Sequence, residues 1–586
     1  MPITDNHDIR NDFEIKEKLN KDIAVKRFNK LFDEADANRA TKYQLWEENE
    51  QLYHNITLAK DKRAKRSNIF VPHLKTAIQS ILPRVLEVIF SGGKIIDVEA
   101  RFPNQRKKAE IVSDLIQFNL DTFADAYLEF HNLVLQVLKQ GTGFLKVMWD
   151  ASKQSVYFRQ VDISDVWVDP MATTIDNARY VIHRIETTWQ HLLAQEKAGV
   201  YKGVSELKGF LADPIKGESL RYERLDDRAI YGTEDSGDSK VVLWELWTPQ
   251  GVASIVAKHY CIRLSNNAYE YIPFLRGLDY PDENNFYGTG EIELGKDLAR
   301  EINKKRNQRM DNVDMILSPI ILHDSTKVDV GELYQIYPGK VISSKEALQG
   351  SIRDAISVHT TPDITGPSVR EEEMLKIEFQ NSLSVNDFMQ GQTGPSLNDT
   401  ATGMQIVADQ MTKRFRMKAD ILLHTIIVPL GRMIMLCYSK FMTQDKIIRM
   451  VTKSGDPEYV TIIPGLLDNI EDQFDLRAVG YNAFVNKIAE QQQITQMFAT
   501  LTNPVLMNML TTEGYTIDLP EIVREYLTVF DKKTAILKRI DQQPNPNEAT
   551  SFLPSAGQPQ LGGPTGQAEG QAETPLQQLP VGGQNA

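Results

Sequence analysis

The stretch from Tyr287 to Phe441 constrains the fold more than any other part of this chain, because long helical patterns alternate in it with segments that break them. Leu294, Leu298 and Ile302 recur every four residues within a segment rich in lysine and arginine, which predicts a helix with one narrow apolar stripe. The residues that follow form short β-branched runs interrupted by proline and glycine, which favour strands and turns. We therefore expect a helix that leads into a small strand-rich insert.

Two further helical patterns follow the insert. The segment that starts at Thr361 opens with proline and serine start signals and has acidic residues in its first turn, which favour the positive end of the helix dipole. A loop rich in Gly, Pro, Asn and Thr comes next, and the pattern from Met404 to Phe441 is then almost unbroken helix. A kink is expected where Pro429 and Gly431 interrupt it.

This order of elements resembles the stem, clip, stem, tunnel loop and wing helix of tailed-bacteriophage portal proteins, above all those of short-tailed phages. The likeness rests on the segment FYGTGEIELGKDLAREINKKRNQRMDNV, which starts at Phe286, and on the sequence TATG at 400–403 before the long helix. It extends from Ile9 to Ile540 in the order and proportion of the parts. The resemblance implies an α+β, helix-rich fold with wing, stem, clip and crown parts.

The resemblance also divides the chain into parts. These are an α+β wing at 1–290, a stem helix at 291–314, a strand-rich clip at 315–360, a returning stem helix at 361–386, a tunnel loop at 387–403, a long wing helix with a hairpin at 404–480, crown helices at 481–541 and a disordered tail at 542–586. The tail is dominated by Gln, Gly, Pro and Ala, and such a composition buries too little apolar surface to offset its ordering entropy.

The same resemblance proposes functional residues in four places. A basic band of the stem comprises Lys304, Lys305, Arg306 and Arg309, and the tunnel loop contributes Asn386, Gln390, Gln392, Asn398 and Thr400. Phosphate contacts near the channel are expected from Lys413, Arg414 and Arg416, and the clip contributes Tyr334, Tyr337 and Lys340. The basic band either faces DNA or pairs with Glu371, Glu372 and Glu373 across neighbouring helices, and we favour pairing. Without the resemblance, the tunnel loop would be read as a plain surface loop.

Composition limits the alternatives. The chain has 586 residues, 41% of them hydrophobic and 25% charged, which is ordinary for a globular protein with several cores. Its charged start predicts no signal peptide, and no apolar run reaches the roughly 18 residues of a membrane span. Cys261 and Cys437 are the only cysteines, which excludes a disulfide framework and a cysteine-rich zinc site and favours two apolar core positions. The net charge of −13 suits a channel through which DNA slides, since tight phosphate contacts would add friction, but it suits other proteins equally well.

The sequence offers no enzymatic site, cofactor site or metal site. HExxH, a P-loop and a GxSxG elbow are all missing, and the near miss GEIELGKD from Gly290 reads as helix. The GTG sequence at 141–143 follows a helix, so we expect a turn set by backbone geometry. Asp162, Asp165 and Asp169 suggest a cation site or, in the favoured interpretation, turn and cap residues.

Three further expectations concern the wing. Arg106 to Lys139 predicts one amphipathic helix, and the residues from Val241 to Leu264 predict two strands joined by the turn TPQG. The basic run from Lys60 to Arg66 is either a phosphate or lipid contact or, as favoured, a solvated linker.

The function implied by the resemblance is a ring of about twelve subunits at one capsid vertex, through which double-stranded DNA is packaged and later ejected without sequence specificity. Its partners would be further copies of the chain, the major capsid protein, the terminase large subunit, head-tail adaptor proteins and a possible scaffolding protein, with assembly in the host cytoplasm. A ring needs two different contact faces on each subunit. We expect apolar residues of the long helix to be divided between a subunit's own core and its neighbour, namely Ile406, Phe415, Ile421, Leu422, Ile426 and Leu430. The alternatives are a non-ring scaffolding or adaptor protein and an enzyme of unrecognised kind.

Overall fold

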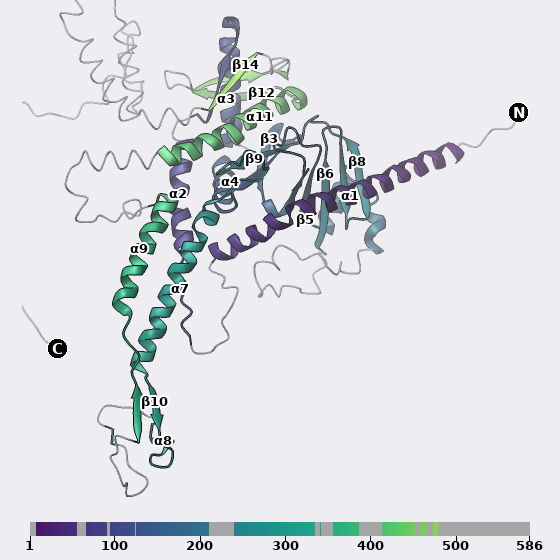
Figure 1. Ribbon diagram of the computed structural model, residues 1–586. Helices are drawn as coiled ribbons and strands as arrows, with labels where there is room; N and C mark the ends of the chain where they lie inside the picture. The colour runs from purple at the N-terminus through teal and green to yellow at the C-terminus, as the bar shows by residue number, and fades with distance from the viewer. Residues whose placement is uncertain are drawn as a thin grey trace, which may run out of the picture. The chain divides into compact units, whose positions relative to one another are not determined.

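The structure is a computed structural model that describes residues 7–54, 66–90, 94–122, 125–209, 240–333, 340–341, 355–385, 413–451, 457–464 and 473–478. The chain divides into two units, Met1–Ile517 and Asp518–Ala586, and all described residues belong to the first. Helices and antiparallel sheets are both present, which confirms the α+β class (Figure 1). The tunnel loop at 387–403, the crown at 481–541 and the tail at 542–586 lie outside the described residues, as do Lys60 to Lys65 of the basic run.

Four helices precede the first large sheet. They are α1 (His7–Tyr53), α2 (His73–Phe90), α3 (Arg106–Thr122) and α4 (Ala126–Gln140). The single helix predicted from Arg106 to Lys139 was wrong, because Asp125 has a φ of 45°, which is left-handed and ends helical geometry between α3 and α4. Strand β1 (Ile96–Ala100) lies between α2 and α3 and pairs antiparallel with the distant β14 (Phe474–Ala478).

Two antiparallel sheets form the middle of the chain. The three-stranded sheet has the order β3-β2-β9, built from β2 (Thr142–Asp150), β3 (Ser155–Val161) and β9 (Phe274–Leu278). The five-stranded sheet runs in chain order through β4 (Val166–Val168), β5 (Val181–Thr188), β6 (Lys240–Trp247), β7 (Gly251–Val256) and β8 (Tyr260–Asn266). Helix α5 (Trp189–Lys197) follows β5. The prediction of two strands here missed β8, because a second turn with positive φ at Ala257 and Lys258 folds the chain back once more.

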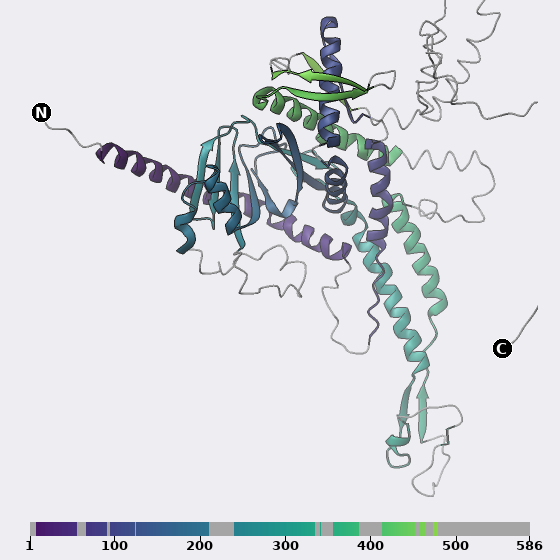
Figure 2. The ribbon, with the colours of Figure 1, turned by 180° about the vertical axis from the view of Figure 1, so that it is seen from behind.

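Helices α7 (Glu291–Leu317) and α9 (Thr365–Leu383) lie side by side, and we refer to them as the helix pair (Figures 1 and 2). Between them come β10 (Ile320–His323), the short α8 (Val330–Leu333) and β11 (Ile356–His359). Strands β10 and β11 pair antiparallel with Ile320 opposite His359, which gives a two-stranded ribbon at the far end of the helix pair. The predicted succession of helix, strand-containing insert and helix is present.

The long helix is described from Lys413 to Phe441. Its predicted irregularity takes the form of a π-helical turn, Leu423–Ile427, directly before α11 (Val428–Phe441). A wide turn suits this position, because Pro429 donates no hydrogen bond and its ring would crowd the carbonyl of Thr425 in a regular helix. Beyond α11, β12 (Lys446–Val451) and β13 (Pro457–Ile462) form the predicted hairpin.

The main core surrounds the long helix. Phe415, Leu422, Ile426 and Leu430 are buried with side chains of α2, α3 and α4. These four residues therefore lie in the subunit's own core, while Ile421 is half-buried and Ile406 lies outside the described residues. The division with a neighbouring subunit stays a prediction. Among the described residues, this helix alone is long and apolar enough to cross a membrane, and its burial marks it as a core helix.

The GTG turn after α4 is determined by backbone geometry, as predicted. Gly141 has a φ of 77° and caps α4, and a Cβ atom there would lie 2.3 Å from the carbonyl oxygen of Gly288. Gly290 approaches equally closely, because its Cβ would lie 2.6 Å from the backbone nitrogen of Gly141. The turn before β2 and the turn before α7 therefore pack backbone against backbone.

Of the three aspartates of the proposed cation site, Asp162 and Asp169 serve as cap and turn residues, as favoured, whereas Asp165 pairs with an arginine. Asp162 accepts a hydrogen bond from the backbone nitrogen of Ser164, and Asp169 binds the guanidinium of Arg179. Asp165 lies 3.4 Å from Nε of Arg184. No cluster of three or more metal-ligating side chains occurs within the described part of the chain.

Candidate functional site: the helix pair and its base

The basic band of α7 pairs with α9 of the same chain. Lys305 Nζ lies 2.7 Å from a carboxylate oxygen of Glu371, and Arg309 lies 2.6 Å from a carboxylate oxygen of Glu372. Glu372 is buried and also binds Lys376 at 2.9 Å. Although burial alone would raise it, the pKa of Glu372 is held below its ordinary value by Lys376 and Arg309. The favoured pairing thus occurs within one chain, whereas the prediction placed it between neighbours.

The other two residues of the basic band form no such ion pair with Glu371 or Glu372 within the described part of the chain, and they differ in exposure. Lys304 is exposed, and Arg306 is half-buried. The carboxylate of Glu373 on α9 is exposed. The band is therefore partly used to hold the helix pair together, and Lys304 is its most accessible member.

Substitution of Glu372 tests whether its ion pairs hold the helix pair together. We expect Glu372→Gln to destabilise the chain by about 2–3 kcal/mol, because Arg309 and Lys376 would lose a buried charged acceptor. Glu371→Gln, in a pair that is half exposed, should cost below about 1 kcal/mol. Urea unfolding of both variants measures the difference, and equal costs would contradict the assignment.

A ladder of polar side chains, two amides and one carboxylate, fastens an extended segment to α7. The backbone nitrogens of Ser67, Ile69 and Val71 donate to the side chains of Asp311, Asn307 and Asn303 at 2.6, 2.7 and 2.8 Å. Asn303 and Asn307 also donate back to the carbonyls of Val71 and Ile69. The spacing matches, since four helical residues rise about 6 Å and two extended residues about 6.6 Å.

We expect the buried end of this ladder to matter most. Asn303→Ala should cost about 1–3 kcal/mol in urea unfolding, because it leaves both polar groups of Val71 without their partner in a half-buried place. The exposed Gln308→Ala on the same helix is the control and should cost below about 0.5 kcal/mol. If Asn303→Ala lowers the free energy of unfolding as little as the control does, water replaces the hydrogen bonds of Asn303 to Val71.

The helix pair and its ribbon expose many apolar side chains. More than a third of the surface is exposed at Met315, Ile316, Leu317, Ile320, Leu322, Val358, Ile364, Val369, Met374 and Ile377. A two-stranded ribbon is marginal by itself, and clustered apolar exposure of this kind marks an interaction surface. Of the clip residues, Lys340 is half-buried, while Tyr334 and Tyr337 lie outside the described residues. The tunnel-loop residues Asn386, Gln390, Gln392, Asn398 and Thr400 also lie outside them.

The base of the helix pair contains a buried ion cluster, the base cluster, which consists of Asp279, Tyr280, Glu291, Arg414 and Lys418. Lys418 Nζ contacts the carboxylates of both Asp279 and Glu291, the latter at 2.6 Å, and all three residues are fully buried. The ammonium also lies 3.8 Å from the centre of the Tyr280 ring. The cluster thus joins the segment after β9, the first turn of α7 and the long helix.

Arg414, for which a phosphate contact was predicted, belongs to this base cluster. Its guanidinium donates to the hydroxyl of Tyr280, to the carbonyl of Ser382 at 3.1 Å and to the hydroxyl of Ser384. These hydrogen bonds occupy most of the N–H groups of the guanidinium, and the phosphate contact of Arg414 stays a prediction. Lys413 is exposed and Arg416 is half-buried, so these two remain the better candidates.

The base cluster holds two carboxylates against one ammonium group. Burial, together with the charge of Glu291, raises the pKa of Asp279 to about 7, although Lys418 opposes the shift. The pKa of Lys418 is raised as well, because both carboxylates outweigh the effect of its burial. The second oxygens of Asp279 and Glu291 are buried without a hydrogen-bond partner among the described residues.

A pH dependence of stability follows from Asp279. Between about pH 4 and pH 7 the folded chain keeps a proton on Asp279 that the unfolded chain releases, so this group makes stability fall as the pH rises. Asp279→Asn should remove that slope, which is at most about 1.4 kcal/mol per pH unit. Urea unfolding at pH 5 and pH 7 measures it, and an unchanged difference between the two pH values in the variant would contradict the assignment.

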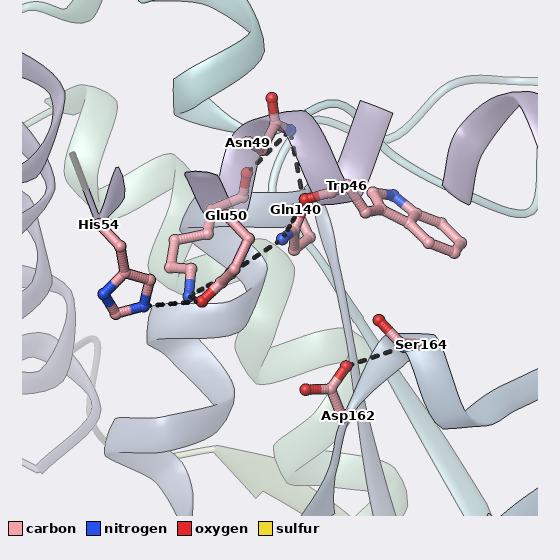
Figure 3. Close-up of polar contacts among 8 residues, drawn as sticks. Trp46, Asn49, Glu50, His54, Gln140, Asp162 and Ser164 are labelled. Atoms are coloured by element: carbon pink, nitrogen blue, oxygen red, sulfur yellow. Dashed lines mark hydrogen bonds and ion pairs between the residues drawn. The ribbon is translucent and has the colours of Figure 1, made fainter. Parts of the chain in front are cut away.

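A second polar network lies between α1 and α4 (Figure 3). Glu50 binds Lys139 at 2.6 Å, Gln140 at 3.2 Å and His54 at 2.9 Å, and Gln140 also donates to the carbonyl of Trp46. A cavity of about 370 Å³ lies beside this network. Because Glu50 pairs with Lys139 and Gln140 of α4, the network fastens α1 to α4.

Sequence reasoning missed Asp279, Glu291 and Lys418. The available signal was weak, because Lys418 lies close to the charged Arg416 and Asp420, and only its four-residue spacing from Arg414 places those two side chains on one helical face. A buried charge needs a partner, but the sequence does not show which residue supplies it.

A family model described as Phage SU10 portal protein matches residues 26–161 and 151–551, well over half of the chain. No curated protein matches the chain. The match agrees with the helix pair, the strand-containing insert and the long helix that follow one another in the fold. The chain therefore belongs to the phage SU10 portal protein family, a family of tailed-bacteriophage portal proteins.

Proposed function

We propose that copies of this chain close into a ring at one capsid vertex, through which double-stranded DNA is packaged and later ejected. Membership of a portal family supports this role, and portal proteins are structural proteins. The observation that carries the ring is the apolar surface of the helix pair and its ribbon, which one chain leaves uncovered. A second copy fits this surface, since each subunit of a ring contacts two neighbours through different faces.

The parts of the ring are proposed on the same basis. The helix pair would be the stem, with Lys304 nearest the channel, and the insert from 315 to 360 would be the clip. The segment 387–403 would be the tunnel loop, and Lys413 and Arg416 would contact phosphate. A match to a portal family supports these roles, and no nucleotide site is apparent in the sequence, so another chain would supply the energy for DNA movement.

The proposed partners are those of a portal. They are the terminase large subunit on the clip during packaging, head-tail adaptor proteins afterwards, the major capsid protein around the wing and a possible scaffolding protein during assembly in the host cytoplasm. A subunit number of twelve and a short-tailed virion are parts of the same proposal.

Microscopy and native mass spectrometry of the purified chain test the ring. We expect a closed ring with a central hole, and a monomer or small oligomer would favour a scaffolding or adaptor protein instead. Met374→Glu combined with Ile377→Glu should prevent ring closure, because both residues are exposed on α9. Met171→Glu is the matched control, since Met171 is 77% exposed in the five-stranded part and should leave the ring intact.

The phosphate contacts need a separate test. Charge reversal of Lys413 and Arg416 should lower the amount of DNA packaged, whereas Arg414 is left unchanged because it stabilises the fold. An unchanged amount of packaged DNA in rings that assemble normally would contradict the proposed phosphate contacts.

A further inference from the structure

The long helix contains one π-helical turn, Leu423–Ile427. Such a turn accommodates one extra residue, and one residue corresponds to a rotation of about 100° around the helix axis. If the turn were lost or moved along the helix, the side chains before it would rotate relative to those behind it. The two sides of the turn must therefore be fixed independently.

Behind the turn, α11 is fixed by close packing. A Cβ atom on Gly431 would lie 3.0 Å from Cδ1 of Ile96, so the helix backbone lies directly against β1. The hydroxyl of Tyr438 donates to Asn119 of α3 at 2.8 Å inside the core. These contacts leave no rotational freedom to this half of the helix.

Before the turn, Arg414 and Lys418 make the polar contacts. They lie four residues apart on one helical face and reach three other segments. Lys418 binds Asp279 after β9 and Glu291 in α7, and Arg414 binds Ser382 and Ser384 at the end of α9. A rotation of about 100° would remove both side chains from all of these partners.

The π turn itself lies against a glycine. A Cβ atom on Gly277 of β9 would lie 3.2 Å from Ile426 and 3.3 Å from Leu422, so the absence of a side chain lets the wide turn approach the sheet. The sequence thus provides a place for the turn as well as contacts on both sides of it.

We propose that Arg414 and Lys418 lock the rotational register of residues 413–422, and that the π turn is the point about which this part of the helix turns when the lock is released. The lock ties the end of α9 to the start of the long helix within one chain. It does not depend on ring formation or on DNA, so it stands apart from the proposed function.

Hydrogen–deuterium exchange of the full chain tests the lock. In Lys418→Met we expect the exchange rate of residues 413–422 to rise by about tenfold more than that of residues 430–441, beyond any rise that both segments share through global unfolding. Lys440→Met is the matched control on the other side of the turn, where Lys440 pairs with the exposed Glu270, and it should change neither segment. An equal rise on both sides would mean general destabilisation and would overturn the proposal.

A variant without these charges, the neutral variant, distinguishes loss of the rotational lock from destabilisation by an unpaired buried charge. Asp279→Asn, Glu291→Gln and Lys418→Met together leave no unpaired charge from these three residues, so this variant should fold even where Lys418→Met does not. The lock predicts that residues 413–422 still exchange rapidly in it. Protection restored to the level of the natural chain would overturn the proposal.

A thiol probe gives a second readout. Ala419 is fully buried before the turn, and Cys437 is fully buried behind it. In the neutral variant, Ala419→Cys should introduce a thiol that reacts with a thiol reagent, while Cys437 stays unreactive. If the thiol introduced by Ala419→Cys is as unreactive as Cys437, the register has not changed.

Discussion

Replacement of Lys418 by methionine is expected to destabilise the folded chain by about 3–5 kcal/mol. The ammonium is buried between Asp279 and Glu291, and its loss leaves two buried carboxylates without the cation that contacts both of them. Burying an unpaired carboxylate is costly, and the chain can lower this cost only by taking up protons. Urea unfolding followed by circular dichroism measures the change.

The control for this prediction is Lys440→Met in the same helix. Lys440 also forms an ion pair, but its partner Glu270 is 78% exposed, so solvent screens the pair and Lys440→Met should change the free energy of unfolding little. If Lys418→Met costs no more than Lys440→Met, the base cluster does not stabilise the fold. A smaller loss for Lys418→Met at pH 5 than at pH 7 is also expected, because protonation of Asp279 removes one of the two charges.

Replacement of Gly141 by alanine is expected to cost about 3–5 kcal/mol, the second large effect. An alanine at a φ of 77° is strained, and its Cβ would also lie 2.3 Å from the carbonyl oxygen of Gly288. Since backbone lies on both sides, no flexible side chain can move away. The turn before α7 would have to shift, and with it the base of the helix pair.

Gly199→Ala separates the two parts of this cost. Gly199 has a φ of 79°, almost the same as Gly141, but nothing lies within 4 Å of its Cβ position. It should therefore show only the backbone strain, about 1 kcal/mol. Similar melting temperatures for the two variants would contradict the proposed contact between the turns.

Much of the local structure could be predicted from the sequence. The four-residue spacing of Leu294, Leu298 and Ile302 predicts α7, and the turn residues between β-branched runs predict the β12–β13 hairpin. The GTG sequence at 141–143 predicts a backbone turn, which the structure contains. These signals are local, since each depends on residues only a few positions apart.

Two predictions of secondary structure were wrong, and in both the chain turns at a place where the sequence has no clear turn signal. The break at Asp125 left the apolar periodicity of α3 and α4 nearly continuous, so the two read as one helix. The turn at Ala257 and Lys258 contains neither glycine nor proline, so β8 was missed. Asp125 tolerates a left-handed backbone conformation because its side chain is short and polar, whereas Ala257 and Lys258 have no such preference and adopt it through tertiary packing.

The sequence by itself determined the order of helices, strands and turns, and through that order the likeness to portal proteins. Tertiary structure alone decided the partners of the buried charges at the base of the helix pair. Lys418 and Asp279 are 139 residues apart in the chain, and Arg414, predicted to bind phosphate, binds Tyr280 and Ser382. The physical reason is that helical and strand periodicity repeats within a few residues, whereas a buried charge is satisfied by whichever opposite charge the fold brings into contact with it.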